Sequence, residues 1–569
     1  MNESRIKILD NDLINKISAG EVIERPASVV KELIENSIDA GATRVTVQVS
    51  DAGKKLILVS DNGSGMTKAE LELAVQRHAT SKITSLDDLF SIRTLGFRGE
   101  ALPSIAAVSR FEAVSSGARV VVEGGKLAKS EDYGGPQGTS IEVRDLFYNT
   151  PARLKFLKTN YTEQGHIIDA VTKTALSRPS VAFRLSLDGA DTLMTSGGGD
   201  LLDAVVSLYG VELAESLLPV QFEKDGIKVC GLVSKPNISR VDRNYESFFV
   251  NGRFVRYFLL NRALEDAYRT LIPGNRYPVG ILFIEIDPGE VDVNVHPAKR
   301  EIKFKKAREV MSVLTSGVAS GLSKLLGDQD IGPSTLRQDS GQAGSGQGYQ
   351  EMREWKPEMM EIFSETGPRT SDLGLRTLEV TDVQPLMPLY QHKNTYIICT
   401  DGEDIIFIDQ HAAHERIIFD ELQTVPAQGI APQQQSLLVP ENLEFTAKES
   451  AVIEENLEEI KQLGFDIEAF GKNSFVVRSV PNMLTKVPAK EMLLELLSEL
   501  SSVEKRKENI FKMIACKAAI KAGDRLSTEE MNQLIKDLYK TENPLTCPHG
   551  RPTMVKLSQA DFERMFART

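Results

Sequence analysis

The sequence predicts a multidomain α/β protein. At 569 residues the chain is too long for one hydrophobic core. Helical and strand-like patterns alternate through its first half, and a stretch rich in Gly, Ser and Gln then interrupts them. We therefore expect folded domains at 1–215 and 216–328, a flexible, disordered linker at 329–384 and an α+β domain at 385–569.

The first two domains carry clear helix and strand patterns. Residues 27–40 place Val30, Leu33, Ile34 and Ser37 on one face of a helix. Runs rich in β-branched and aromatic residues predict strands at 44–50, 55–60, 246–250 and 279–286. Both domains are therefore expected to be α/β.

Order returns after the linker, near Leu386. Residues 396–409 indicate two strands around a turn at Asp401 and Gly402. Helical patterns follow at 446–463 and 487–521, and we assign a regulatory subdomain to about 441–508.

Composition narrows the class of protein. The net charge of −13 excludes a uniformly basic DNA-binding protein, so contacts with nucleic acid must come from local basic segments. No apolar run approaches the ~20 residues that span a bilayer. Four cysteines in so long a chain favour a reducing compartment. We expect a cytoplasmic protein without a membrane segment.

Polar residues and glycines in the first domain predict a nucleotide site. Glu32 and Asn36 lie four residues apart and share one face of a helix. Asp61 directly follows a strand. The other members follow in order at 78–82, at 96–102 and at Gly138 and Thr139. The chain has no G-x-x-x-x-G-K-[ST] motif, so phosphates are not held by a P-loop.

Each residue type suits one part of a nucleotide. Asp61 can accept the exocyclic amine of adenine, and Gly63 and Gly65 let the backbone approach the base. Gly96 and Gly99 would leave backbone N–H groups to face phosphate oxygens.

The Glu32 and Asn36 pair suits hydrolysis at the phosphate end of that nucleotide. Asn36 offers an amide oxygen to Mg²⁺, and Glu32 can polarise the attacking water.

The ordered set resembles the ATP-binding domain shared by gyrase B, heat-shock chaperones, histidine kinases and MutL (the GHKL or Bergerat fold, an α/β sandwich). The strings ELIENSIDAGA, DNGSGM, ATSKI and GFRGEALPSI are similar to the MutL branch of mismatch-repair proteins. The resemblance implies that Glu32 is the general base, that Asn36 is the Mg²⁺ ligand and that Asp61 reads adenine. It implies lid and phosphate contacts from Thr80, Ser81, Lys82, Gly96, Phe97, Arg98, Gly99, Glu100, Ala101, Leu102 and Thr139.

The second domain resembles the S5-like transducer domain of the same family. The segment from His296 to Lys299 is similar to one whose lysine reaches the γ-phosphate, which gives Lys299 a catalytic and ATP-binding role. Basic residues surround Lys299, so a solvated basic segment is the alternative. The two are compatible, because the remaining positive charges could follow a DNA backbone. The candidate DNA path includes 153–158 and 299–308.

A second constellation after the linker predicts a metal site. His411 and Glu415 are four residues apart on an expected helix, with Asp409 just before its first turn. Cys516, Cys547 and His549 lie far along the chain, and on an extended segment Cys547 and His549 would point to one side. Thiolate and imidazole suit Zn²⁺, whereas carboxylates suit Mn²⁺ or Mg²⁺.

The strings DQHAAHERIIFDE, ACKAAIKAGD and CPHGRP are similar to the endonuclease motifs of nicking MutL proteins. The resemblance implies that His411, Glu415, Cys516, Cys547 and His549 are metal ligands and that Asp409 is a catalytic carboxylate. Asp420 stands where the family has a second Glu, which leaves its role open. A closing F-x-R motif has two registers, Phe566 with Arg568 or Phe562 with Arg564.

A short peptide is similar to the sliding-clamp motif of MutL C-terminal regions. In it, Leu437 and Leu438 would fill an apolar pocket while Gln435 fixes the register, ahead of Pro440. An ordinary strand ending at Pro440 is the alternative.

The resemblance implies an ATP-gated homodimer that binds double-stranded DNA and nicks it with the help of a metal. It also implies a MutS-type recognition protein and the sliding clamp as partners, and association with the bacterial nucleoid during repair. An ATP-driven matchmaker with a purely structural zinc site is the alternative. A topoisomerase subunit fits less well, because nothing after the linker resembles the acidic metal-binding domain that such a subunit needs. A sensor kinase fits less well because this sequence contains no membrane segment.

Overall fold

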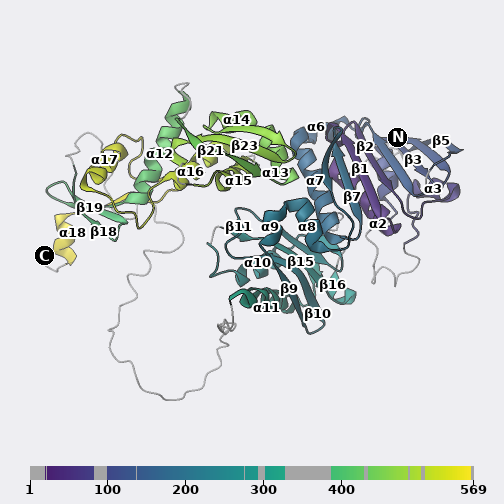
Figure 1. Ribbon diagram of the computed structural model, residues 1–569, viewed down its shortest axis with the longest axis horizontal. Helices are drawn as coiled ribbons and strands as arrows, with labels where there is room; N and C mark the ends of the chain where they lie inside the picture. Colours follow the sequence, from purple (N-terminus) through teal and green to yellow (C-terminus); the bar gives the residue numbers. More distant parts are fainter. Residues whose placement is uncertain are drawn as a thin grey trace, which may run out of the picture. The chain divides into compact units, whose positions relative to one another are not determined.

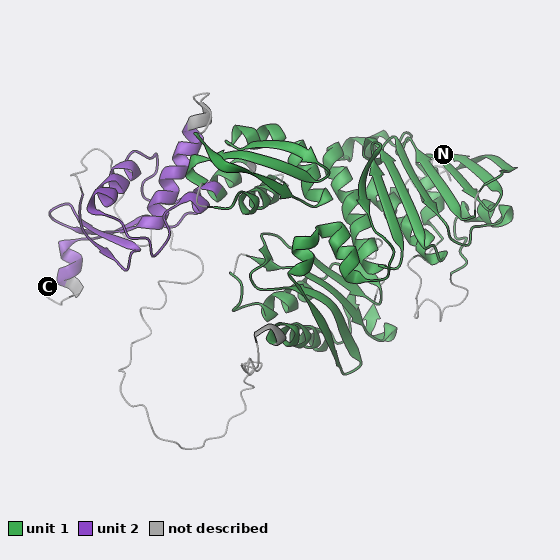
Figure 2. Cartoon of the chain, in the orientation of Figure 1, with its two compact units in different colours: residues 1–330, 425–513 green, residues 331–424, 514–569 purple. Residues whose placement is uncertain are grey.

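The computed structural model describes most of both halves of the chain. The described residues are 19–20, 22–82, 96, 99–135, 137–273, 276–292, 302–326, 386–427, 433–484, 487–500 and 506–565. The predicted linker at 329–384 lies outside them. By contacts the chain divides into two units, Met1–Asp330 with Val425–Met513 and Ile331–Thr424 with Ile514–Thr569 (Figure 2).

The first domain of unit 1 is built on one large sheet with the order β5-β4-β3-β6-β2-β1-β7-β8 (Figure 1). Its strands are β1 Arg44–Ser50, β2 Leu56–Asp61, β3 Arg110–Ser115, β4 Ala118–Glu123, β5 Lys126–Asp132, β6 Thr139–Arg144, β7 Ala182–Leu187 and β8 Ala190–Met194. Val45, Val47 and Val49 are buried while their neighbours are not, as the alternating pattern predicted. Asp61 is the last residue of β2, an interior strand, so it lies where the strand ends and between β1 and β6.

Helices α2 (Pro26–Asp39) and α7 (Asn160–Ser177) pack against each other and against this sheet. The predicted apolar face of α2 is confirmed, because Val30, Leu33, Ile34 and Ser37 are all buried. Shorter helices complete the domain: α3 Lys68–Ala74, α5 Ala101–Ala107, α6 Pro151–Phe156, α8 Leu201–Tyr209 and α9 Val211–Glu215. Glu32 and Asn36 therefore lie on the face of α2 that leaves the core.

The second domain has the sheet order β13-β12-β15-β10-β9 with α10 (Phe258–Ala267) and α11 (Ala307–Leu326). The strands are β9 Leu217–Lys224, β10 Ile227–Ser234, β12 Glu246–Val250, β13 Arg253–Val255 and β15 Gly280–Glu285, with short pairs β11 Ser239–Arg240, β14 Tyr277–Pro278, β16 Val291–Asp292 and β17 Lys303–Phe304. Phe249 and Ile281 of this domain are buried in the core of the first. The two predicted domains therefore share apolar packing.

The remaining part of unit 1 has the sheet order β21-β23-β22. It comprises β21 Gln434–Glu444, α13 Ala447–Glu455, α14 Leu457–Gln462, β22 Asp466–Gly471, β23 Ser474–Pro481 and α15 Ala489–Leu500. The single helix predicted at 446–463 is wrong, because the chain breaks at Asn456 and forms two helices.

Unit 2 has the sheet order β18-β19-β20-β24, and its apolar core lies between that sheet and α12 and α17. Its strands are β18 Met387–His392, β19 Tyr396–Thr400, β20 Ile405–Asp409 and β24 Met554–Leu557, and its complete helices are α17 Thr528–Leu538 and α18 Gln559–Met565. Helices α12 (Gln410–Ala427) and α16 (Arg506–Ala518) cross the boundary between the units, and their residues up to Thr424 and from Ile514 belong to unit 2. The predicted turn at Asp401 and Gly402 is confirmed, since β19 and β20 pair on either side of it. Both the multidomain α/β organisation and the α+β character after the linker are thus confirmed.

Within the described ranges, no helix combines the length and apolar character needed to cross a membrane.

Candidate nucleotide and metal sites

Asp61 is held in one orientation at the end of β2. Its Oδ2 accepts a hydrogen bond from Ser37 Oγ at 2.8 Å, and its Oδ1 accepts from the backbone N–H groups of Gly63 at 2.9 Å and Thr139 at 3.2 Å. A carboxylate offers about four acceptor positions, so further capacity is left for an adenine amine. Ser37 was expected only as part of the buried helix face, and its contact with Asp61 was not predicted.

The glycines after Asp61 are required by the protein's own packing. A Cβ on Gly63 would lie 2.9 Å from the carbonyl oxygen of Ala40. Gly65 has φ +71°, and a Cβ there would lie 2.1 Å from Ser116 Oγ. Both positions therefore bring the loop against its neighbours, beside the expected base position.

A lysine lies against the predicted Mg²⁺ ligand. Lys82 Nζ donates to Asn36 Oδ1 at 2.9 Å and to Asp39 Oδ2 at 2.5 Å, and all three side chains are mostly buried or half-buried. An ammonium at this oxygen shows that Asn36 presents its acceptor to a cation. One turn earlier, Glu32 Oε1 lies 3.5 Å from Lys31 Nζ.

The two segments expected around the phosphates, 78–82 and 96–102, meet beside α2. His78 donates its backbone N–H to Gly99 O at 3.1 Å, and Gly96 donates its own to Asp39 Oδ2 at 3.1 Å. Helix α5 begins at Ala101, so Glu100, Ala101 and Leu102 lie at a helix start as expected. Thr80 Oγ1 accepts from the N–H of Lys82, next to Ser81. Phe97, Arg98, His296 and Lys299 lie outside the described residues.

Two features of this site were not foreseen. Thr139 was expected with the phosphate contacts, yet it pairs directly with Asp61 between β6 and β2, at the end assigned to adenine. The guanidinium of Arg253, from β13, is buried, and this lowers its pKa even though Glu35 and Asp39 act in the opposite direction. Asp39 and Arg253 were not predicted as site residues, and tertiary packing alone brings Lys82 against Asn36 and Asp39.

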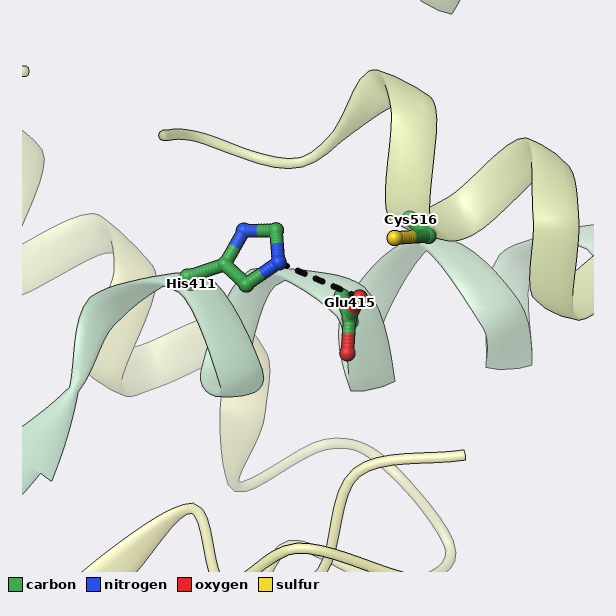
Figure 3. A group of neighbouring side chains, drawn as sticks. All are labelled: His411, Glu415 and Cys516. Atoms are coloured by element: carbon green, nitrogen blue, oxygen red, sulfur yellow. Dashed lines mark ion pairs between the residues drawn. The ribbon is translucent and has the colours of Figure 1, made fainter. Parts of the chain in front are cut away.

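The predicted metal ligands come together around Glu415. The donor atoms of His411, Glu415 and Cys516 lie within 4.8 Å of one another, and so do those of Glu415, Cys547 and His549 (Figure 3 shows the first group). His411 Nε2 lies 3.2 Å from Glu415 Oε1, and His549 Nδ1 lies 3.3 Å from Glu415 Oε2. Glu415 thus links two groups, each containing a thiol and an imidazole.

The polarity of His411 suits a metal ligand. Its Nδ1 lies 2.8 Å from the carbonyl oxygen of Ile520, which accepts the ring N–H and leaves Nε2 to face Glu415 and Cys516. Cys516 and Glu415 raise the pKa of His411 to about 10. Burial alone would raise the pKa of Glu415, but its hydrogen bonds with His411 and Cys516 hold it at about 2. The cluster therefore attracts positive charge, and its sulfur, nitrogen and oxygen donors fit Zn²⁺ or a similar ion.

The segment with Cys547 and His549 is a tight turn, so the extended conformation expected for it is wrong. Cys547 N donates to Arg551 O at 2.8 Å, and Gly550 N donates to Cys547 O at 2.9 Å. Gly550 has φ +83°, which favours glycine. The turn still directs both Cys547 and His549 to Glu415.

Residues that sequence reasoning missed hold the loop after Cys516. Gln410 is fully buried, and its Nε2 donates to the carbonyl oxygens of Asn394, Lys521 and Asp524 at 2.8–3.1 Å. His414 Nδ1 accepts from the backbone N–H of Ile520 at 3.0 Å. Ile520 is thus held through its N–H by His414 and through its carbonyl by His411.

The two aspartates near the metal cluster have different structural roles. Asp409 Oδ1 accepts from the N–H groups of His411 and Ala412 at 2.9 and 3.0 Å, so Asp409 caps α12. Asp420 Oδ1 lies 3.2 Å from Arg416 Nη1, and its Oδ2 accepts from the N–H of Glu542 at 2.8 Å. Asp420 therefore supports the surrounding loops and is in neither group of ligand atoms.

The predicted clamp peptide protrudes from its strand. In β21 the pairing with β23 shifts between Ser436 and Glu441, so the intervening residues leave the ladder. Leu438 is fully exposed and Val439 is 74% exposed, while Gln435 and Pro440 are also on the surface. The alternative, an ordinary strand that ends at Pro440, does not fit this interrupted pairing, because β21 continues to Glu444.

The structure describes only parts of the other predicted segments. Arg153 packs its guanidinium against Gly20 and is half-buried, whereas Lys155 and Lys158 are exposed. Lys303, Lys305, Lys306 and Arg308 are exposed too, and residues 293–301 lie outside the described chain. Phe562 lies in α18, and the alternative pair Phe566 and Arg568 lies beyond the described residues.

Three stretches of the chain match family models. Residues 23–108 match "Histidine kinase-, DNA gyrase B-, and HSP90-like ATPase", residues 205–323 match "DNA mismatch repair protein, C-terminal domain", and residues 389–526 match "MutL C terminal dimerisation domain". The chain is 40% identical to the DNA mismatch repair protein MutL of Symbiobacterium thermophilum, over 99% of this chain and 100% of the relative. MutL of Geobacter sulfurreducens is 39% identical and that of Bacillus anthracis 38%, each over 99% of both chains.

Proposed function

The chain belongs to the MutL family of DNA mismatch repair proteins, and we propose that it is a homodimeric ATPase that also nicks double-stranded DNA. The observation that carries the nicking activity is the position of Glu415. This buried carboxylate is shared by two groups of metal-binding side chains, His411 with Cys516 and His549 with Cys547.

In the ATPase domain, Asp61 would read adenine, Asn36 would hold Mg²⁺ and Glu32 would act as the general base. The amide oxygen of Asn36 already accepts from a cationic side chain, which supports its assignment as a metal ligand. Glu32 lies one turn away on the same face of α2, from which it would polarise a water at the γ-phosphate. Lys299 of the second domain would sense that phosphate by its charge.

In the C-terminal site, bound Zn²⁺ together with Mn²⁺ or Mg²⁺ would supply an activated water and stabilise charge on the phosphodiester. His411, Glu415, Cys516, Cys547 and His549 would hold the ions, while Ile520 O fixes the His411 tautomer. The Glu415 side chain is only 4% exposed, yet that of His549 is 41% exposed, so a DNA backbone can approach from the His549 side. Asp409, next to His411, is the proposed catalytic carboxylate.

Homodimerisation is expected from the C-terminal dimerisation domain. The outer face of its sheet carries an apolar row across neighbouring strands, Tyr390, Ile398, Phe407 and Val555, at paired positions. Tyr390 and Val555 are 61% and 47% exposed. A second copy covering this face would bury the row.

The proposed partners are double-stranded DNA, a MutS-type mismatch-recognition protein and the sliding clamp. The fully exposed Leu438 in the bulge of β21 supports the clamp assignment. Exposed Lys155 and Lys158, and the basic residues from Lys303 to Arg308, support a DNA path by their positive charge.

The second candidate function is an ATP-driven matchmaker with a structural zinc site. The capping role of Asp409 favours this function, because the two hydrogen bonds at the start of α12 account for an aspartate at this position without any catalytic role.

Nicking of supercoiled plasmid by the full-length protein with Mn²⁺ separates the two. We expect nicking by the parent and by Glu421→Ala, an exposed neighbour on α12, and none by Glu415→Ala. Failure of the parent to nick, even with clamp and ATP, would favour the matchmaker. A Glu32→Ala variant should keep ATP binding and lose hydrolysis, which tests the ATPase assignment separately.

A further inference from the structure

We propose that α13 and α15 form an intramolecular docking module that binds the ATPase domain and the second domain together, and that releases them reversibly. Both helices belong to unit 1, although they lie more than a hundred residues beyond the two domains in sequence. The proposal does not depend on nuclease or ATPase activity.

The first contact joins α13 to the second domain. Tyr245 Oη donates to Glu449 Oε1 at 2.5 Å, and Tyr245 is buried with its ring 5.3 Å from that of Tyr209. The other oxygen of Glu449 accepts from the backbone N–H and the hydroxyl of Thr446, which completes the capping box of α13. One carboxylate therefore caps its own helix and satisfies a buried phenol of another domain.

The second contact joins α15 to the same domain through charge. Arg276 Nη2 lies 2.5 Å from Glu491 Oε1 and 2.8 Å from Glu495 Oε1. The side chains of Arg276 and Glu495 are only 16% and 8% exposed. Because both charges are largely removed from solvent, loss of one partner would leave the other as an uncompensated buried charge, which is strongly destabilising.

Further contacts reach the ATPase domain. Thr159, the cap of α7, donates to Glu455 Oε1 at 2.8 Å, and Lys490 pairs with Glu212. Between these polar contacts, Ala447 and Ala451 of α13 pack against the ATPase core. Small side chains at these positions let α13 approach α7 closely.

The character of the interface supports reversible docking. It leaves a cavity of about 90 Å³, lined by α7 and α8 on one side and by α13 and α15 on the other. Domain cores contain few voids larger than a water molecule, whereas interfaces between domains are more polar and less tightly packed. Because the module contacts two domains at once, a hinge motion between them must break one set of contacts.

A zero-length carbodiimide cross-link on the full-length protein tests this arrangement. We expect an amide between Lys490 and Glu212, found by mass spectrometry, with the local pair Lys461 and Glu458 as the internal standard. Arg276→Glu should lower the yield of the Lys490–Glu212 cross-link at least tenfold, although it touches neither residue. The charge swap that adds Glu491→Arg and Glu495→Arg should restore it.

Arg262→Glu, a 62% exposed arginine on α10, is the matched control and should leave the cross-link unchanged. The proposal would be overturned by the absence of a Lys490–Glu212 product when the internal standard forms, by a yield insensitive to Arg276→Glu, or by no recovery in the charge swap. In dimers mixed from ¹⁵N-labelled and unlabelled chains, the product must join residues of one chain. A product found only between chains would assign the contact to the partner copy and overturn docking within one chain.

Discussion

Arg416 Nη1 lies 3.2 Å from Asp420 Oδ1 on successive turns of α12, and Arg416 Nε also donates to the carbonyl oxygen of Thr546 at 2.6 Å. Because Thr546 directly precedes Cys547, this pair connects the helix that carries Glu415 to the turn that carries the second thiol. It gives a structural reason for the carboxylate at position 420.

We predict that Asp420→Asn weakens metal binding without removing a ligand. Loss of the charge on Asp420 should loosen Arg416 and the Cys547 turn, and changes to such supporting groups cost roughly 10- to 100-fold in metal affinity. Competition with a chromophoric chelator measures the affinity, and Glu421→Gln is the neighbouring control. A reduced number of bound ions at saturation would instead identify Asp420 as a ligand.

The contact of Lys82 with Asn36 predicts an unusual dependence on Mg²⁺. Since the ammonium lies at the oxygen assigned to the metal, it can neutralise phosphate charge when Mg²⁺ is absent. Lys82→Met should therefore lower ATP affinity about tenfold or more in EDTA, roughly the 1.4 kcal/mol of one tenfold step, and much less in excess Mg²⁺. Isothermal titration calorimetry provides the comparison. Lys68→Met, an exposed lysine in the same domain, is the control. An equal loss in both conditions would make Lys82 an ordinary phosphate contact.

Leu438 should contribute to clamp binding and almost nothing to folding. Because its side chain is fully exposed, Leu438→Ser removes no buried contact and should change stability by less than about 0.5 kcal/mol. Binding to the sliding clamp, followed by surface plasmon resonance, should weaken at least tenfold. Phe470→Ser, which is also largely exposed, should bind like the parent. Retained clamp affinity in Leu438→Ser would reject the motif.

Glu246 predicts a loss of stability as pH rises. Burial raises the pKa of this carboxyl from 4.5 to about 8, even though Asn261 donates a hydrogen bond to it. The folded state therefore keeps a proton that the unfolded chain releases above pH 4.5, so stability falls between about pH 4.5 and 8.

Glu246→Gln should remove this dependence and raise stability at pH 8.5 by more than about 1 kcal/mol, with little change at pH 4.5. Urea unfolding at the two pH values measures the difference. Glu285→Gln, which replaces an exposed carboxyl of the same domain, should show no such gain. A gain of equal size at both pH values would indicate an effect other than ionisation.

Local patterns in the sequence determined the helix and strand periodicities and the types of side chain present at both candidate sites. The buried face of α2, the turn at Gly402 and the order β20 to α12 follow from residues within a few positions of one another. Periodicity failed where a local break intervened, as at Asn456, where one amphipathic pattern became two helices.

Tertiary structure alone decided which distant groups meet. The sharing of Glu415 between His411 and His549, the contact of Lys82 with Asn36 and the pairing of Arg276 with Glu495 each join segments far apart in the chain. The sequence gives the side chain at each position, and interactions over a few residues decide whether the backbone there forms a helix or a strand. Which loops converge depends on how the helices and sheets pack, and that packing is set by buried apolar surface from the whole chain.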